Sequence, residues 1–473
     1  MESSTTTMSA KPIGTPDLLE ALRDGLRGEL CLPGDPGYEE ARTIWNAAID
    51  RRPAAVIRAA GAADVMRAVR VAHEHDLLLS VRGGGHNIAG NAVCDGGLML
   101  DLSRMRSVRI DPARRIARVE PGVTLAELDR EAQAFGLATP LGINSTTGVA
   151  GLTLGGGFGW ISRKYGLTVD NLLSADVVTA AGELVRASEE DHPDLFWALR
   201  GGGGNFGVVT SFEYRLHPLG PEVLAGLIVH PADGGRELLD GYRRLAASAP
   251  DELTCWVVMR KAPPLPFLPQ EVHGTDVIVL ALCHAGGVEE ATRAVASLKA
   301  LGKPHAAMVG PMPFVAWETA FDPLLGPGFR NYWKSHDFRA LSDGAIDVML
   351  DYARRMPSPH CEVLLAQLGG AINRVPADAT AYPHRDVQFI ANIHTRWSDP
   401  GQDAECIGWA RTLFGALAPH ATGGVYVNFM PEDEAQRVSS GAYGANYGRL
   451  TRIKATYDPG NVFRLNQNIG PAV

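Results

Sequence analysis

Apolar and polar positions along the first part of the chain predict alternating strands and helices. Short apolar runs at 54–58 and 77–81 are typical of strands. Helical spacing of apolar residues is found in three stretches, at 17–30, 63–75 and 124–136. The last stretch begins at Thr124 and ends at Gly136, residue types that commonly start and end a helix. We therefore expect a strand–helix–strand unit that leads directly into a glycine-rich segment beginning at Arg82.

Further along the chain, the pattern changes character twice. Antiparallel strands are predicted at 98–102, 107–111 and 116–119, a hairpin at 176–179 with 184–187, and a further strand at 207–216. Beyond about residue 218 the glycine clusters stop, and strands such as 277–283 alternate with helices such as 289–301. Near residue 423 tyrosine, asparagine and glycine become frequent again. These shifts predict an α+β protein with an inserted domain and a C-terminal return to the first domain. The proline-rich tract 261–270 is interpreted as a surface loop near a sheet edge.

Composition narrows the class of protein and its partners. The 473 residues are too many for one ordinary core, and the net charge of −9 argues against nucleic acid or an anionic membrane surface as the main partner. No stretch has the ~20 consecutive apolar residues of a membrane-spanning helix, and residues 1–11 lack the apolar core of a signal peptide. The six cysteines are scattered, so neither a disulfide framework nor a structural metal site is expected. We expect a cytoplasmic protein without a metal.

Three glycine clusters are the strongest chemical signal in the sequence. They are 82–87 (RGGGHN), 151–159 (GLTLGGGFG) and 201–207 (GGGGNFG). Glycine permits positive φ and lets backbone N–H groups converge on an anion, as in a phosphate nest. A single cluster is more often an ordinary loop. The spacing also does not match the G-x-G-x-x-G fingerprint of nicotinamide cofactors. Three such loops in one region favour a long dinucleotide such as FAD, bound by another architecture.

The order of four motifs makes the chain similar to a known family. The segments SVRGGGHNIAG (80–90), GVAGLTLGGGFGWISRKYGLTVDN (148–171) and GGGGNFGVV (201–209), with the C-terminal YVN, YGANY, YDPGNVF and NQ, resemble the berberine bridge enzyme-like FAD-linked oxidases. This family has the vanillyl-alcohol-oxidase, or PCMH-type, flavin-binding fold. The resemblance covers almost the whole chain beyond about residue 40. It implies a tail and helix at 1–40, an FAD-binding domain of two α/β subdomains at 41–217, a substrate domain with an antiparallel sheet flanked by helices at 218–422, and a closing segment at 423–473.

The resemblance also implies how FAD is held. His86 corresponds to the histidine that bonds to the flavin 8α-methyl group, and Asn144 stands where many members have a second, cysteinyl bond. A single covalent bond is therefore expected, as in the branch that includes 6-hydroxy-D-nicotine oxidase. A small residue at Gly142 is associated in the family with access of oxygen to the flavin. The other residues expected to contact the cofactor are Arg82, Gly83, Gly84, Gly85, Asn87, Gly90, Thr146, Gly148, Gly151, Gly155, Gly156, Gly159, Gly207, Val209, Asn428 and Asn466.

For catalysis, the resemblance points to Tyr426 as the general base, with Tyr443 and Tyr447 as alternatives. A phenol needs a hydrogen-bonding or charged partner to act as a base near neutrality, and Tyr426 has the alternative role of packing against flavin or substrate. The substrate is expected between the flavin and the sheet of the inserted domain, a small molecule oxidised with O2 as acceptor. Residues considered for binding it are Gln367, Asn373, Trp397 and Tyr443, with His384, Arg385 and His394.

Two other functions remain open. One is a flavin dehydrogenase or oxidative cyclase that uses another acceptor, and the other is a flavin- or ligand-binding protein without turnover. The substrate is expected to be an alcohol, sugar or amine-bearing natural product, and the protein a monomer or homodimer.

Overall fold

The N-terminal sheet is built around a parallel crossover. The computed structural model describes residues 16–472. Strands β1 (Glu29–Cys31), β2 (Ala55–Arg58), β3 (Leu79–Arg82) and β4 (Leu98–Asp101) form one sheet in the order β1-β2-β4-β3. Helix α3 (Ala62–Glu74) buries its apolar face and connects β2 to β3. Strand β4, which follows β3 through the connection 83–97, lies between β2 and β3 and is parallel to both, so the prediction of an antiparallel strand at 98–102 is wrong. The helix expected at 17–30 is α1 (Pro16–Arg23), and it ends earlier because β1 follows it.

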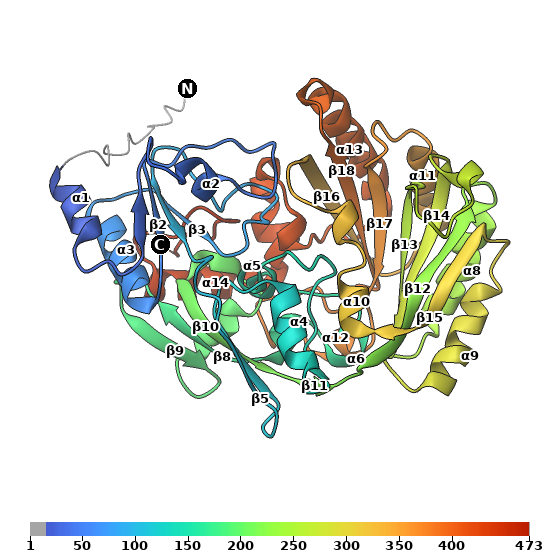
Figure 1. Cartoon of the computed structure of the whole chain (residues 1–473), viewed down its shortest axis with the longest axis horizontal. Helices are drawn as coiled ribbons and strands as arrows, with labels where there is room; N and C mark the ends of the chain where they lie inside the picture. Colours follow the sequence, from blue (N-terminus) through green and yellow to red (C-terminus); the bar gives the residue numbers. More distant parts are fainter. Residues whose placement is uncertain (1–15, 473) are drawn as a thin grey trace.

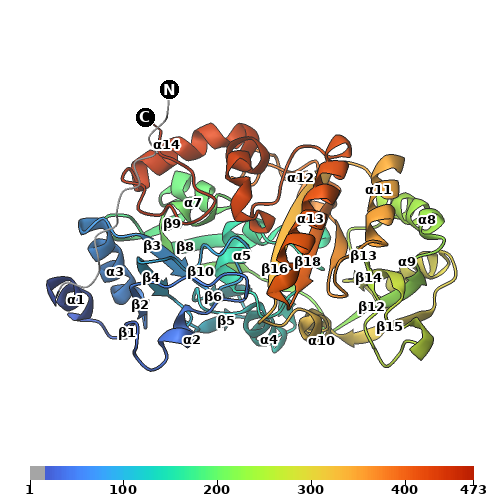
Figure 2. The same cartoon turned by 90° about the horizontal axis from the view of Figure 1, so that it is seen from above.

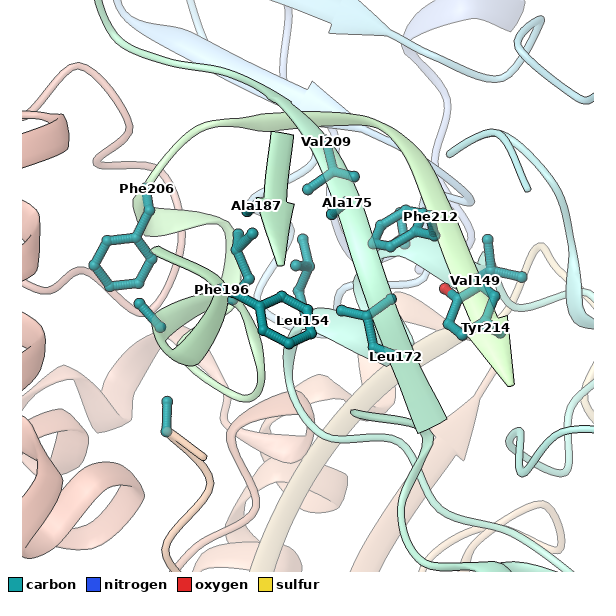
Figure 3. Packing of buried hydrophobic residues seen from close by; sticks show 14 of the residues in the cluster. Val149, Leu154, Leu172, Ala175, Ala187, Phe196, Phe206, Val209, Phe212 and Tyr214 are labelled. Carbon is teal, nitrogen blue, oxygen red and sulfur yellow. The ribbon is translucent and has the colours of Figure 1, made fainter. Parts of the chain in front are cut away.

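A second, antiparallel sheet carries the middle of the N-terminal half. Its strands lie in the order β5 (Val108–Asp111), β6 (Ile116–Val119), β10 (Val208–Arg215), β8 (Leu172–Val178) and β9 (Leu184–Ser188). The predicted hairpin is the β8–β9 pair. Figure 3 shows Leu154 of α5 (Val149–Leu154) and Phe196 of α7 (Pro193–Leu199) in the core formed with strands β8 and β10. Helix α4 (Leu125–Gln133) begins at the predicted Thr124, which forms a capping box with Glu127.

The largest sheet is antiparallel and lies on the other side of the molecule (Figure 1). Its strands lie in the order β15 (Ala306–Pro313), β12 (Glu222–Pro231), β14 (Asp276–His284), β13 (Leu253–Lys261), β17 (Glu362–Gln367), β18 (Phe389–Trp397) and β16 (Arg330–Phe338). Helices α8 (Gly235–Ala247), α9 (Val288–Lys299), α11 (Asp343–Ala353) and α13 (Asp403–Leu417) lie beside it (Figures 1 and 2). Because side chains alternate along a strand, one face packs on these helices and the other faces the N-terminal half.

The C-terminal segment returns to the N-terminal half, where α14 (Tyr447–Tyr457) lies near α7 (Figure 2). Lys454 of α14 is fully buried and donates to Asp458 Oδ2 at 2.5 Å and to the carbonyl of Asn205 at 2.7 Å. Asp458 in turn accepts the backbone N–H groups of Val462 and Phe463 at 2.7 and 2.9 Å. This buried ion pair fastens the end of the chain to the third glycine cluster.

Short elements complete the fold. They are α2 (Tyr38–Arg42), β7 (Leu137–Ala138), α6 (Ser162–Tyr165), β11 (His217–Pro218), α10 (Phe314–Glu318) and α12 (Ala371–Arg374). No helix in the described part of the chain is long and apolar enough to cross a membrane. Strands of the smaller sheets end at β11 and those of the large sheet begin at β12, near the predicted change at 218. The division into domains at 41–217, 218–422 and 423–473 stays a prediction.

Candidate active site

A cavity of about 310 Å³ lies between the glycine loops and the inner face of the large sheet. One wall comes from segments 83–87, 142–154 and 203–209, and the opposite wall from strands β13, β16, β17 and β18. The C-terminal segment supplies further residues, among them Tyr426, Asn428 and Tyr443. The volume falls in the range of ordinary small-molecule and cofactor sites. Elements far apart in the chain therefore meet at one site.

The first glycine cluster presents a row of unused backbone donors to this cavity. Among the described residues, no hydrogen-bond acceptor is found for the backbone N–H groups of residues 83–87. Glycine is required here, because a Cβ on Gly84 would come within 2.3 Å of the backbone nitrogen of Gly148. Gly85 also has φ of +75°, a conformation that favours glycine. Consecutive free N–H groups of this kind form a nest for an anion such as a diphosphate.

His86 follows the three glycines of this cluster, and its ring contacts three neighbouring side chains. Its imidazole stacks on the Trp45 ring at 5.0 Å between centroids, with Nε2 at 3.1 Å from Thr146 Oγ1 and Nδ1 at 3.4 Å from Thr147 Oγ1. Burial, together with the positive charge of Arg82, lowers the pKa of His86 to about 4. The imidazole is therefore neutral at physiological pH. A neutral imidazole keeps a nitrogen lone pair that is available for bonding.

Tyr426 lies on the same cavity and is almost fully buried. Its hydroxyl oxygen accepts the backbone N–H of Gly157 at 3.0 Å and the side-chain amide of Asn428 at 2.9 Å. Burial raises the pKa of Tyr426 to about 12, although both hydrogen bonds act in the opposite direction. The two N–H donors favour the phenolate and occupy the acceptor side of the oxygen. The hydroxyl proton is therefore left for another acceptor.

Three glycines of the second cluster allow close packing near Tyr426 and Asn428. A Cβ on Gly155 would lie 2.2 Å from Asn428 Oδ1, and a Cβ on Gly156 would lie 3.3 Å from the Tyr426 ring. A Cβ on Gly159 would lie 2.0 Å from the carbonyl oxygen of Leu141. None of these three glycines lines the cavity. Gly155 and Gly156 therefore pack closely beneath Asn428 and Tyr426, and Gly159 packs against Leu141; contact of these three glycines with the cofactor stays a prediction.

The large sheet contributes a polar group of residues that the sequence analysis missed, apart from His394. The cavity-lining side chains of this group are Trp256, Trp333, Glu362, Asn392 and His394. The indole N–H groups of Trp256 and Trp333 and the Oδ1 atom of Asn392 have no hydrogen-bond partner among the described residues. Asn392 and His394 alternate with Ile393 on β18, so a period of two in polar residues was the available signal.

Most of the predicted site residues line the cavity or lie just outside it. Those that line the cavity are Gly83, Gly84, Gly85, His86, Asn87, Gly142, Asn144, Gly148, Gly151, Gly207, Val209, Tyr426, Asn428, Tyr443 and Asn466. Arg82, Gly90 and Thr146 lie just outside it, with Thr146 in contact with His86.

The three remaining substrate candidates are not brought to the cavity, which corrects that expectation. Gln367 lies on the helix-covered face of the sheet and bonds to the N–H of Cys255 at 2.9 Å. Asn373 donates to the carbonyl of Val387 at 3.1 Å, and Trp397 donates to Asp403 at 2.7 Å. Strand register decides this, since odd-numbered residues of β17 face away from the cavity. His384 and Arg385 also lie outside the cavity. His384 is hydrogen-bonded to the carbonyl of Ala442, and Arg385 donates to Asp170.

Comparison with known proteins agrees with this geometry. The model of an FAD binding domain matches residues 53–188, and that of the berberine and berberine-like segment matches residues 425–470. (R)-6-hydroxynicotine oxidase of Paenarthrobacter nicotinovorans is 34% identical over 94% of this chain and 97% of its own length. The chain belongs to the berberine bridge enzyme-like FAD-linked oxidoreductases. It is therefore an FAD-dependent oxidoreductase of this family, with a small-molecule substrate.

Other members of the family support the same assignment. A xylooligosaccharide oxidase of Thermothelomyces thermophilus is 30% identical over 90% of this chain and 89% of its own length. The crystal structure of 6-hydroxy-D-nicotine oxidase from Arthrobacter nicotinovorans superposes with a TM-score of 0.85 at 31% identity, covering 94% of this chain and 98% of that one. These relatives have different substrates in their names, so membership of the family does not name the substrate here.

The residues at the cavity fit FAD. The free N–H groups of residues 83–87 suit its diphosphate, and the neutral His86 lies beside them. The Tyr443 hydroxyl and Asn466 Oδ1 line the cavity without a hydrogen-bond partner among the described residues. Buried polar groups of this kind are normally satisfied, so they indicate positions for polar atoms of a bound molecule. Residues 16–472 contain no cluster of His, Cys, Asp and Glu side chains suited to a metal ion.

Proposed function

We propose that the protein is an oxidase that carries FAD covalently on His86 and uses dioxygen as its electron acceptor. Its substrate is a small molecule with a hydroxyl- or amine-bearing carbon. The observation that carries the proposal is that one cavity is lined both by the neutral imidazole of His86 and by the hydroxyl of Tyr426, which is held by two N–H donors. The chemistry supplied by bound FAD is acceptance of a hydride, with the two electrons passed on to dioxygen to give hydrogen peroxide.

The covalent attachment rests on the state of His86. A neutral imidazole nitrogen is nucleophilic, whereas an imidazolium is not. The new bond would join this nitrogen to the flavin methyl carbon with loss of one hydrogen from each partner, and dioxygen would take up the two electrons and two protons as hydrogen peroxide. Trp45 and the Thr146 and Thr147 hydroxyls hold the ring in one orientation, which favours attachment at one site. Asn144 has no thiol, so no second attachment is proposed.

Tyr426 is proposed to accept the proton that leaves the substrate hydroxyl as the hydride departs from carbon. The N–H of Gly157 and the amide of Asn428 would stabilise the phenolate, and the phenolate would accept the proton. Gly142 lines the cavity, and a Cβ there would lie 3.0 Å from the end of the Leu152 side chain. We propose that the absence of a side chain at Gly142 leaves room for dioxygen, which favours an oxidase over a dehydrogenase.

The test is the intact mass and visible spectrum of the acid-denatured protein after small molecules are removed. We expect a yellow chain, heavier by one FAD less two hydrogens, and an unmodified colourless chain for His86→Ala. His73→Ala, which removes an exposed histidine on α3, is the matched control and should keep the flavin. A colourless wild-type chain of unmodified mass would contradict the covalent bond. Peroxide release under air then tests the oxidase, because a dehydrogenase would reduce an added dye instead.

A dehydrogenase or oxidative cyclase is the second candidate, because the buried Tyr426 could accept a proton in either reaction. Cytoplasmic location and a monomeric or dimeric state remain proposals. A flavin-binding protein without turnover is the alternative that a broad substrate panel with no flavin reduction would favour.

A further inference from the structure

A second, apolar cavity opens beside the active-site cavity. It has a volume of about 60 Å³, and we call it the annex. The two cavities share Ile143, Trp256, Leu325, Glu362 and Leu364 in their walls, so they meet at these residues. The annex lies against the inner face of strands β12, β13 and β14, which contribute Val229, Val258 and Val279 among others.

The loop after β13 closes the annex. Leu265 and Leu268 of the proline-rich tract 261–270 turn inward and line it, opposite Trp160. The tract also follows an interior strand, because β13 pairs with both β14 and β17. The interpretation of this tract as a loop at a sheet edge is therefore corrected. Apart from Arg260, Glu362 and two indole N–H groups, the described residues in the wall of the annex offer no polar side-chain atom.

The charges at these cavities cancel. Among the described residues, Glu362 and Arg260 are the only carboxylate and guanidinium groups in the two walls, and they pair with each other at 2.8 Å. His394 lies 3.1 Å from the other carboxylate oxygen. Burial raises the pKa of Glu362, but Arg260 and His394 lower it to about 2, so the carboxylate is ionised. Its two oxygens already have Arg260 and His394 as partners. A charged group on a bound substrate would find no counter-ion of its own, and its desolvation would go uncompensated.

The polar atoms left without partners match a neutral hydroxyl group. The indole N–H groups of Trp256 and Trp333 can donate, and Asn392 Oδ1 can accept. A hydroxyl both donates and accepts, and its oxidised form, a carbonyl, accepts two N–H groups. The annex holds about four to six non-hydrogen atoms, if one water needs ~10–15 Å³. This is the size of a phenyl ring or a branched alkyl group.

We propose that the substrate is an uncharged alcohol with an apolar group of about the size of a phenyl ring, and that this group binds in the annex while the hydroxyl binds between Tyr426 and Asn392. This inference rests on the proposed function and specifies its substrate class. Ammonium compounds are poor substrates because the Glu362 carboxylate is already paired with Arg260 and His394. Long polar oligosaccharides are poor substrates because their hydroxyls would lose hydrogen bonds to water in the annex.

The test is equilibrium binding of ketones, the products of alcohol oxidation, to the flavin-loaded protein, followed by the change in flavin absorbance. The probes are methyl ketones joined to a phenyl ring by one to four methylene groups, with 2-butanone as the short reference. Burial of a phenyl group predicts that the best member binds about 10- to 100-fold more tightly than 2-butanone. The phenylalkylamine of the same length, charged at neutral pH, should bind at least about 10-fold more weakly than that ketone.

Variants that fill the annex separate this cause from general hydrophobicity. Val279→Phe on β14 places a ring in the annex and should remove most of the gain from the phenyl group. Leu265→Trp fills it from a loop that adjusts more easily, and decides the matter if Val279→Phe does not fold. Met308→Phe adds the same ring at an exposed position of β15 and should keep the gain.

Three outcomes would overturn the inference: no gain from the phenyl group in wild type, a gain that persists in the filled variants, or an amine that binds as tightly as the ketone. Binding does not depend on turnover, so the two proposals fail separately. Peroxide release from alcohols without any effect of the phenyl group would leave the oxidase intact and reject the annex. Ketone binding that depends on the annex without any peroxide release would support the annex and reject the oxidase.

Discussion

Replacing Tyr426 by phenylalanine tests the proton acceptor directly. With a pKa of about 12, only about one molecule in 10⁴ carries the phenolate at pH 8, since each unit of pH changes that fraction tenfold. The wild-type rate constant for flavin reduction should therefore rise about tenfold per pH unit between about pH 7 and pH 10. Loss of a general base costs about 10²- to 10⁴-fold, or about 2.7–5.4 kcal/mol of transition-state stabilisation. Tyr426→Phe should show this loss at alkaline pH and a flat pH profile.

The assay is anaerobic stopped-flow mixing with substrate, following the visible absorbance of the bound flavin. The substitution also leaves the Gly157 N–H without its acceptor, at a cost of about 1–3 kcal/mol, and leaves the Asn428 amide with only the carbonyl of Leu152. Flavin content and unfolding temperature must therefore be measured on the same preparation. Asn428→Ala is the companion variant: it removes one donor that lowers the pKa of Tyr426, and should reduce the rate about 10-fold while keeping the slope with pH. A sloping profile that survives in Tyr426→Phe would refute the reasoning.

Two further predictions concern the packing of Gly155 against Asn428 and a pair of buried carboxyl groups on α4 and α10. A Cβ on Gly155 would lie 2.2 Å from Asn428 Oδ1, so Gly155→Ala should displace that amide and slow flavin reduction about 10-fold. Gly408→Ala on α13, where a Cβ meets nothing, is the control, and equal rates in both variants would contradict the contact. Burial raises the pKa of Asp129 on α4 to about 8, and it also raises the pKa of Glu318 on α10, to which Asp129 and Asp322 add. A carboxyl whose pKa is raised by folding stabilises the fold at low pH and loses that contribution as pH rises above its usual range. Asp129→Asn should therefore gain thermal stability relative to wild type between about pH 5 and pH 9, and a difference that does not vary with pH would reject this.

Local patterns predicted elements better than they predicted pairing. Helices α3 and α4 and the β8–β9 hairpin follow from apolar spacing and capping residues, which act within a few neighbouring residues. The direction of β4 did not follow, because the strand's own sequence is compatible with either neighbour arrangement. The connection 83–97, which brings the chain back before β4 begins, decides it. The same limit applies to Gln367 and Trp397, which were considered for substrate binding although the register of their strands turns them away from the cavity.

The sequence by itself determined the family and the cofactor, because the motifs around His86, the second and third glycine clusters and the C-terminal tyrosines are short and occur in order. Only the tertiary structure decided what each cluster does. Backbone N–H groups of residues 83–87 are free, whereas Gly155 and Gly156 pack beneath Tyr426 and Asn428, and nothing in a run of glycines distinguishes these uses. The polar side chains of the large sheet and the annex come from strands and loops between residues 143 and 394. Their chemistry depends on which side chains meet across that distance, and long-range packing rather than local pattern sets it.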